Sequence, residues 1–88
     1  MVYVDPLCRN GWVLRGHTVM NCHMFADDLE ELHEMALRIG MKMAWFQEDK
    51  RLPHYDLTSS RRAMAVGLGA KEVTKRQLVD FMREGKKP

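Results

Sequence analysis

Residues 17–40, HTVMNCHMFADDLEELHEMALRIG, contain the two patterns that decide the fold class. The first part, from His17 to Met24, can place alternate side chains on opposite faces, which predicts a β-strand. The second part predicts a helix from about Asp28 to Ile39, because Asp28 and Glu31 have capping-box spacing and Gly40 follows as a stop. A strand followed by a helix is the repeating unit of α/β domains.

The rest of the chain continues this alternation of strands and helices. Two further helices are predicted, from Ser59 to Leu68 and from Thr74 to near Gly85. Shorter β-like runs complete the pattern at Val2–Val4, Lys42–Phe46 and Ala70–Val73, with a turn at Asn10-Gly11 after the first. This order predicts an α/β fold with three helices and a small, mostly parallel sheet of three or four strands.

Length and composition restrict the possible classes. The chain has 88 residues, 45% of them hydrophobic and 30% charged, with a formal net charge of +2. This predicts a single domain at residues 1–85 with a solvated tail at residues 86–88, and it argues against disorder. We expect no membrane partner and no signal peptide, since the apolar stretches are short and the first residues lack the targeting pattern. Two cysteines are too few for a disulfide scaffold, so we expect free thiols and a cytoplasmic location.

Reactive side chains are concentrated where the predicted strands end. In an open parallel sheet, ligands bind beyond the carboxyl ends of the strands. Carboxylates, imidazoles and a guanidinium together suit a divalent metal as cofactor, or a phosphate group. We expect a pocket in which Asp5 and Asp56 bind the metal, His54 and His23 are catalytic, and Arg61, His33 and Tyr55 bind the ligand.

Several of these residues also have a structural interpretation. In a strand, His54 and Asp56 face the same way, but Asp56 or Thr58 could instead cap the next helix while Tyr55 packs its ring. His33 falls within the apolar arc of its helix, where it could bond a backbone carbonyl or a carboxylate. These alternatives remain open at the level of sequence.

Two other groups of residues give weaker signals. No pair among Cys8, His17, Cys22 and His23 has the spacing typical of zinc ligands, so we expect the two thiols to be buried and inert. A nucleic-acid base could stack on Trp12, Trp45 or Phe46. Core packing is nevertheless the ordinary role of aromatic residues at a strand end, where Trp45 and Phe46 lie.

The chain resembles the family known as domain of unknown function 4031. The resemblance covers nearly the whole chain and depends on short motifs: Val4-Asp5-Pro6, Leu29-Glu30-Glu31-Leu32-His33, Arg38-Ile39-Gly40, His54-Tyr55-Asp56, Arg61, Ala65-Val66-Gly67-Leu68-Gly69-Ala70 and Arg76-Gln77-Leu78. It implies a small bacterial or phage protein and marks His23, rather than Cys22, as the family feature. The family has no established activity, so the resemblance supports the positions of the candidate site residues and does not identify a reaction.

The expected function is binding of a phosphate-bearing ligand, with metal-assisted hydrolysis of a phosphoester as the reaction that these residues would support. Whether the protein is an enzyme stays open. A second hypothesis is a non-catalytic phage or accessory protein that binds a host protein through the acidic face of the helix at residues 28–39. A third, less favoured, is nucleic-acid binding through the basic region that begins at Lys71.

Overall fold

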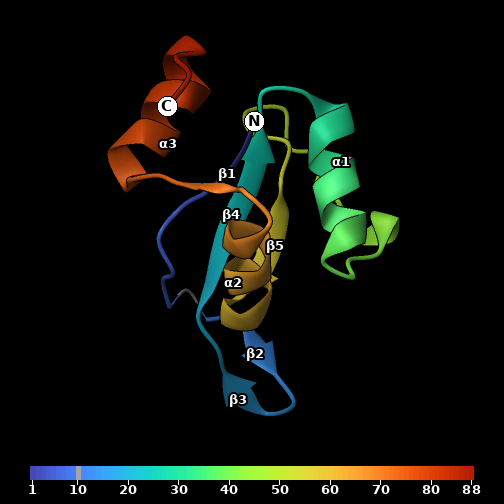
Figure 1. Ribbon diagram of the computed structural model, residues 1–88. Helices are drawn as coiled ribbons and strands as arrows, with labels where there is room; N and C mark the ends of the chain where they lie inside the picture. The colour runs from blue at the N-terminus through green and yellow to red at the C-terminus, as the bar shows by residue number, and fades with distance from the viewer. Residues whose placement is uncertain (10) are drawn as a thin grey trace.

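The computed structural model describes residues 1–9 and 11–88. Four short strands form one sheet in the order β5-β4-β1-β6, with bounds β1 (Val2–Val4), β4 (Asn21–Ala26), β5 (Tyr55–Thr58) and β6 (Lys71–Glu72). Strand β4 pairs antiparallel with both β1 and β5, and only β1 with β6 is parallel. Figure 1 shows β4 at the centre of this sheet. The fold is therefore α/β with a mixed, mostly antiparallel sheet.

The expectation of a mostly parallel sheet was wrong because element order does not give strand direction. A crossover helix alone would return the chain to the starting end of β4 and make the next strand parallel. Here the predicted strand at Lys42–Phe46 is instead a 3-10 helix, η1 (Met43–Trp45). The chain then continues along the sheet, so that β5 starts beside the end of β4, with Tyr55 opposite Met24.

The predicted strand His17–Met24 is divided between two sheets. Strands β2 (Val13–Leu14) and β3 (His17–Thr18) form a hairpin that extends beyond the end of the main sheet (Figure 1). Its two turn residues, Arg15 and Gly16, have φ angles of 53° and 79°. Positive φ at both positions is the type I′ geometry that two-residue hairpins favour. The turn predicted at Asn10-Gly11 includes Asn10, which lies outside the described residues.

The three helices are α1 (Leu29–Arg38), α2 (Ser59–Gly67) and α3 (Lys75–Glu84). Each begins where a side-chain oxygen accepts the hydrogen bond of a free backbone N–H, at Asp28, Thr58 and Thr74 respectively. Thr74 and Gln77 make both bonds of a capping box. These three helix predictions are confirmed. No helix in residues 1–9 and 11–88 is long and apolar enough to span a membrane.

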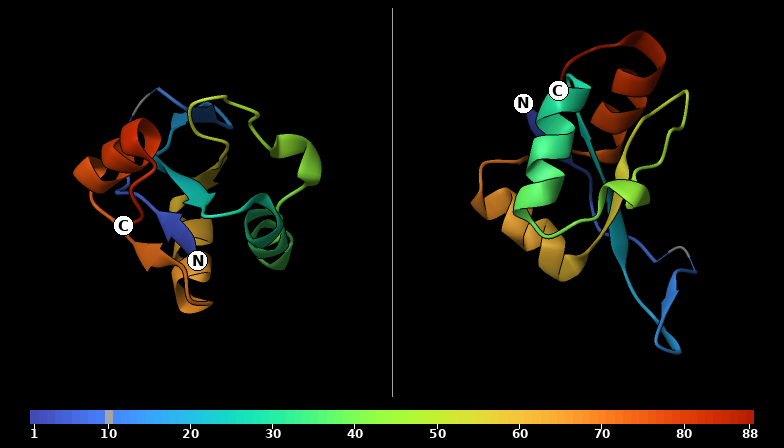
Figure 2. Two further views of the ribbon diagram at one scale, coloured as in Figure 1. Left: turned by 90° about the horizontal axis from the view of Figure 1, so that it is seen from above. Right: turned by 90° about the vertical axis from the view of Figure 1, so that its right-hand side faces the viewer.

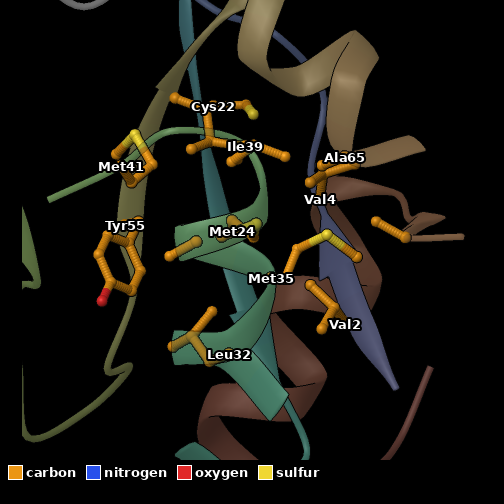
Figure 3. Packing of buried hydrophobic residues seen from close by; sticks show 13 residues of the cluster. Val2, Val4, Cys22, Met24, Leu32, Met35, Ile39, Met41, Tyr55 and Ala65 are labelled. Carbon is orange, nitrogen blue, oxygen red and sulfur yellow. The ribbon is translucent and has the colours of Figure 1, made fainter. Parts of the chain in front are cut away.

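Apolar side chains pack on both faces of the sheet. Helices α1 and α2 cover one face, where Leu32, Ile39 and Ala65 meet Val4, Met24 and Tyr55 (Figure 3). Helix α3 lies on the other face (Figure 2). Its Leu78 packs there against Tyr3 and Phe25. We call these the α1/α2 face and the α3 face. Because side chains alternate along a strand, His23 and Asp56 fall on the α3 face.

Candidate metal centre

Asp5 follows β1 and is a fully buried charged residue. Its Oδ1 accepts a hydrogen bond from the His23 backbone N–H at 2.6 Å, and its Oδ2 lies 3.0 Å from His23 Nδ1 and 3.2 Å from Lys75 Nζ. Burial alone would raise the pKa of Asp5, but the bonds from the His23 side chain and backbone, with that from Lys75, hold this pKa below its ordinary value. Asp5 is thus an anion that fixes the His23 ring.

His54 lies just before β5 and Asp56 lies on it, on either side of Tyr55. His54 Nδ1 donates to the Leu52 carbonyl oxygen at 2.6 Å, and its Nε2 lies 3.5 Å from Asp56 Oδ1. Burial favours the neutral ring, but the acceptors Asp56 and Leu52 outweigh it and raise the pKa of His54. The Asp56 carboxylate therefore favours a cation at His54 Nε2, which can be a proton or a metal ion.

Strand pairing brings the two halves of the centre together. His23 on β4 is directly opposite Asp56 on β5, so their side chains leave the same face of the sheet. The His23 and His54 rings meet edge to face with centroids 4.9 Å apart. One ligand atom each from His23, His54 and Asp56 lies within 4.8 Å of the other two. We call these three residues the metal-ligand group.

The hydrogen bonds of the His23 and His54 rings determine which ring nitrogen remains free to bind a metal ion. Because carboxylate and carbonyl oxygens only accept, Nδ1 carries the proton in both neutral rings. Nε2 then presents its lone pair, as in metal sites where a carboxylate or a carbonyl orients the ligating imidazole. All three side chains are partly accessible, with exposed fractions of 26% for His23, 13% for His54 and 34% for Asp56.

The structure brings together four of the residues predicted for the site: Asp5, His23, His54 and Asp56. Asp5 supports the His23 ring and is not one of the three grouped residues, because both of its oxygens are bonded to His23 or Lys75. His33 and Tyr55 lie elsewhere, on the α1/α2 face. There the Tyr55 hydroxyl lies 2.8 Å from His33 Nδ1, and the Tyr55 side chain is fully buried.

A cavity of about 400 Å³ adjoins the group and has Asp56 in its wall. The remaining lining comes from the hairpin, from η1 and its neighbours, and from the β5–α2 junction: Trp12, Leu14, Met41, Ala44, Trp45, Gln47, Thr58 and Arg61. Arg61, a predicted phosphate ligand, is therefore a wall residue. Its Nε lies 3.3 Å from the Ile39 carbonyl and its Nη2 3.5 Å from that of Gly40, which hold the guanidinium in place.

Sequence reasoning missed two residues of this region. Lys75 reaches Asp5 from the first turn of α3, 70 residues away in sequence, which no local pattern reveals. Asn21 is 97% buried, since its exposed fraction is 3%, and its Oδ1 has no hydrogen-bond partner among the described residues. A polar residue two positions before His23 in a predicted strand was the available signal for Asn21.

Neither cysteine belongs to the metal-ligand group. Cys22 is fully buried on the α1/α2 face, and Cys8 is partly buried before the hairpin. Burial raises the pKa of the Cys22 thiol to about 12, with the nearby Asp5 carboxylate acting in the same direction. Cys22 is thus a protonated core side chain at neutral pH.

Comparison with known proteins gives one match. No curated protein and no solved structure matches the chain. The family described as protein of unknown function (DUF4031) matches residues 2–85, nearly the whole length, which confirms the resemblance seen in the sequence motifs. The chain therefore belongs to the DUF4031 family.

Proposed function

We propose that the protein binds a divalent transition-metal ion through His23, His54 and Asp56 and hydrolyses a phosphate ester in the adjoining cavity. One observation carries this proposal: three ligand atoms of suitable chemistry lie within 4.8 Å of one another, with both imidazoles already held by their Nδ1 atoms. A buried carboxylate behind a ligating histidine is the usual support of such a site.

The ligand set favours particular ions. Two imidazoles and one carboxylate suit Zn²⁺, Mn²⁺, Co²⁺ or Fe²⁺, whereas Mg²⁺ and Ca²⁺ prefer sites built from oxygen atoms. Ligand atoms around a tetrahedral Zn²⁺ lie about 3.3 Å apart. The 3.5 Å between His54 Nε2 and Asp56 Oδ1 is near this value. We expect the remaining ligand distances to shorten when the ion binds.

Three protein ligands leave positions for water and for a phosphate oxygen. A bound divalent ion lowers the pKa of its water toward neutrality and withdraws charge from phosphate. In the reaction, the water oxygen bonds to phosphorus and the P–O bond to the leaving alcohol breaks. One proton of the water ends on the leaving oxygen. Arg61, in the cavity wall, supplies a fixed positive charge for the phosphate oxygens.

Metal binding is tested first by calorimetric titration of the chain with Zn²⁺. We expect one ion per chain, and His54→Ala to weaken binding by at least about 100-fold. His17→Ala is the matched control, because His17 is exposed on the hairpin, outside the metal-ligand group. Native affinity that survives in His54→Ala would contradict the site.

Hydrolysis is tested separately with p-nitrophenyl phosphate and bis(p-nitrophenyl) phosphate in the presence of Zn²⁺, Mn²⁺ or Co²⁺. We expect release of nitrophenolate that His54→Ala abolishes and His17→Ala preserves. If the metal binds at the group but neither ester is cleaved with any of the three ions, the catalytic half of the proposal is wrong.

A further inference from the structure

We infer that the cavity beside the metal-ligand group takes a nucleoside phosphate, so that the substrate class of the proposed hydrolysis is a phosphate ester carrying a planar base. This inference rests on the proposed function, because it assumes that the phosphate faces the metal. It draws on features of the cavity that the metal site does not need.

Both tryptophans of the chain line this cavity, although they are 33 positions apart in sequence. Trp12 precedes the hairpin, and Trp45 is the last residue of η1. The Trp45 side chain is not core packing, since its exposed fraction is 42%. An exposed Trp45 and a partly exposed Trp12 at a cavity of about 400 Å³ provide aromatic surface on which a planar base stacks.

Two cationic side chains lie over the Trp45 ring. Arg61 Cζ lies 5.6 Å and Lys42 Nζ 5.5 Å from the Trp45 ring centroid. Arg61 is fixed by the carbonyls at the end of α1, which take its Nε and Nη2 and leave Nη1 without a bond among the described residues. Aromatic surface next to a guanidinium that is held in place matches a ligand that joins a flat ring to an anion.

Asp56 couples this cavity to the metal-ligand group, because it belongs to both. Its negative charge disfavours a phosphate while no cation is bound. A metal ion on Asp56 reverses this effect and attracts the phosphate oxygens. We therefore expect a nucleoside phosphate to bind more tightly with the metal than without it, and the metal to bind more tightly with the nucleotide by the same factor.

The two tryptophans make binding visible as a change in intrinsic fluorescence. The experiment titrates the full chain with adenosine 5′-monophosphate, ribose 5-phosphate and adenosine, each with and without Zn²⁺. We expect the nucleotide with Zn²⁺ to bind about 10-fold more tightly than either fragment, because stacking and phosphate contacts then act together.

Trp45→Leu should reduce the preference for the nucleotide over ribose 5-phosphate to less than about threefold while leaving Zn²⁺ affinity unchanged. Trp12 remains as the fluorophore in this variant. Met64→Leu is the control, since Met64 is exposed on α2 and does not line the cavity. A folded Trp45→Leu protein that keeps the full preference would overturn the stacking assignment.

The two proposals fail in different ways. Zn²⁺ binding with equal affinity for the nucleotide and ribose 5-phosphate would overturn the nucleoside inference and leave the metal site standing. A nucleotide preference in a chain that binds no Zn²⁺ would overturn the proposed function, together with the coupling through Asp56.

Discussion

The two faces of the sheet place the same residue types in different surroundings. On the α1/α2 face, His33 and Tyr55 bond to each other beside Phe46, and Tyr55 is fully buried. On the α3 face, His23 and His54 keep part of their surface exposed and turn toward Asp56. The histidines on the two faces therefore differ in their partners: His33 bonds to a buried tyrosine, whereas His23 and His54 lie beside the partly exposed Asp56.

The largest effect should come from truncating the buried side of β5. Tyr55→Ala removes a fully buried ring and should lower the free energy of unfolding by about 3–5 kcal/mol, enough to unfold a domain of this size. Asp56→Ala, one position away on the α3 face, should cost less than about 1 kcal/mol and leave the fold intact. Urea denaturation followed by circular dichroism measures both, and similar losses would erase the distinction between the faces.

The cysteines test the same contrast by reactivity. Because its pKa rises from an ordinary 9.0 to about 12, native Cys22 should react with iodoacetamide about a thousandfold more slowly than an ordinary thiol. The neutral thiol is the form that the fold favours. Its contribution to stability is complete below pH 9 and is lost as the pH rises toward 12.

Mass spectrometry of the labelled protein measures the rate at each cysteine. We expect urea to make Cys22 reactive, because unfolding exposes it. Rapid labelling of Cys22 in the folded protein at neutral pH would show that the α1/α2 face is open to solvent.

Asp5→Asn should act on the centre more than on the fold. The amide keeps the shape of Asp5 but loses the charge that orients His23 and pairs with Lys75. We expect Zn²⁺ affinity to fall by about 10- to 100-fold, as is typical when the partner of a ligating histidine is lost. The readout is Zn²⁺ calorimetry on protein shown to be folded by circular dichroism, and unchanged affinity would remove Asp5 from the centre.

The smallest effect should follow His33→Leu. This change leaves the Tyr55 hydroxyl with only the weak acceptor Met43 Sδ and should lower the free energy of unfolding by about 1 kcal/mol. Zn²⁺ affinity and nucleotide preference should stay as in the native chain, because His33 lies on the other face. A loss of metal binding in a stable His33→Leu protein would mean that the two faces are coupled.

The sequence was sufficient for the helices because their signals are local. Caps at Asp28, Thr58 and Thr74 act within three residues, and all three helices begin there. Strand direction depends instead on the path between strands, which is why the sheet was predicted to be mostly parallel. The strand predicted at Lys42–Phe46 was wrong for a related reason. Its apolar residues form η1 beside a cavity rather than a buried strand.

The candidate centre was predictable only in part. The alternation across His54, Tyr55 and Asp56 placed the first and third on one face, as the 3.5 Å contact between them confirms. It also turned Tyr55 to the opposite face, away from the pocket for which it was predicted. The contacts of Asp5 with Lys75, and of His23 with Asp56, depend on tertiary pairing and have no local sequence signal.

The hairpin of β2 and β3 is a place where the cavity can change without a change in the metal-ligand group. Leu14 of the hairpin and Trp12 before it contribute to the cavity wall, yet no hairpin residue belongs to the metal-ligand group found among the described residues. Hairpin tips tolerate substitution and insertion because few buried contacts depend on them. Substitutions or insertions in this projection can therefore alter the cavity wall, while the pairing of β4 with β5 keeps His23 opposite Asp56.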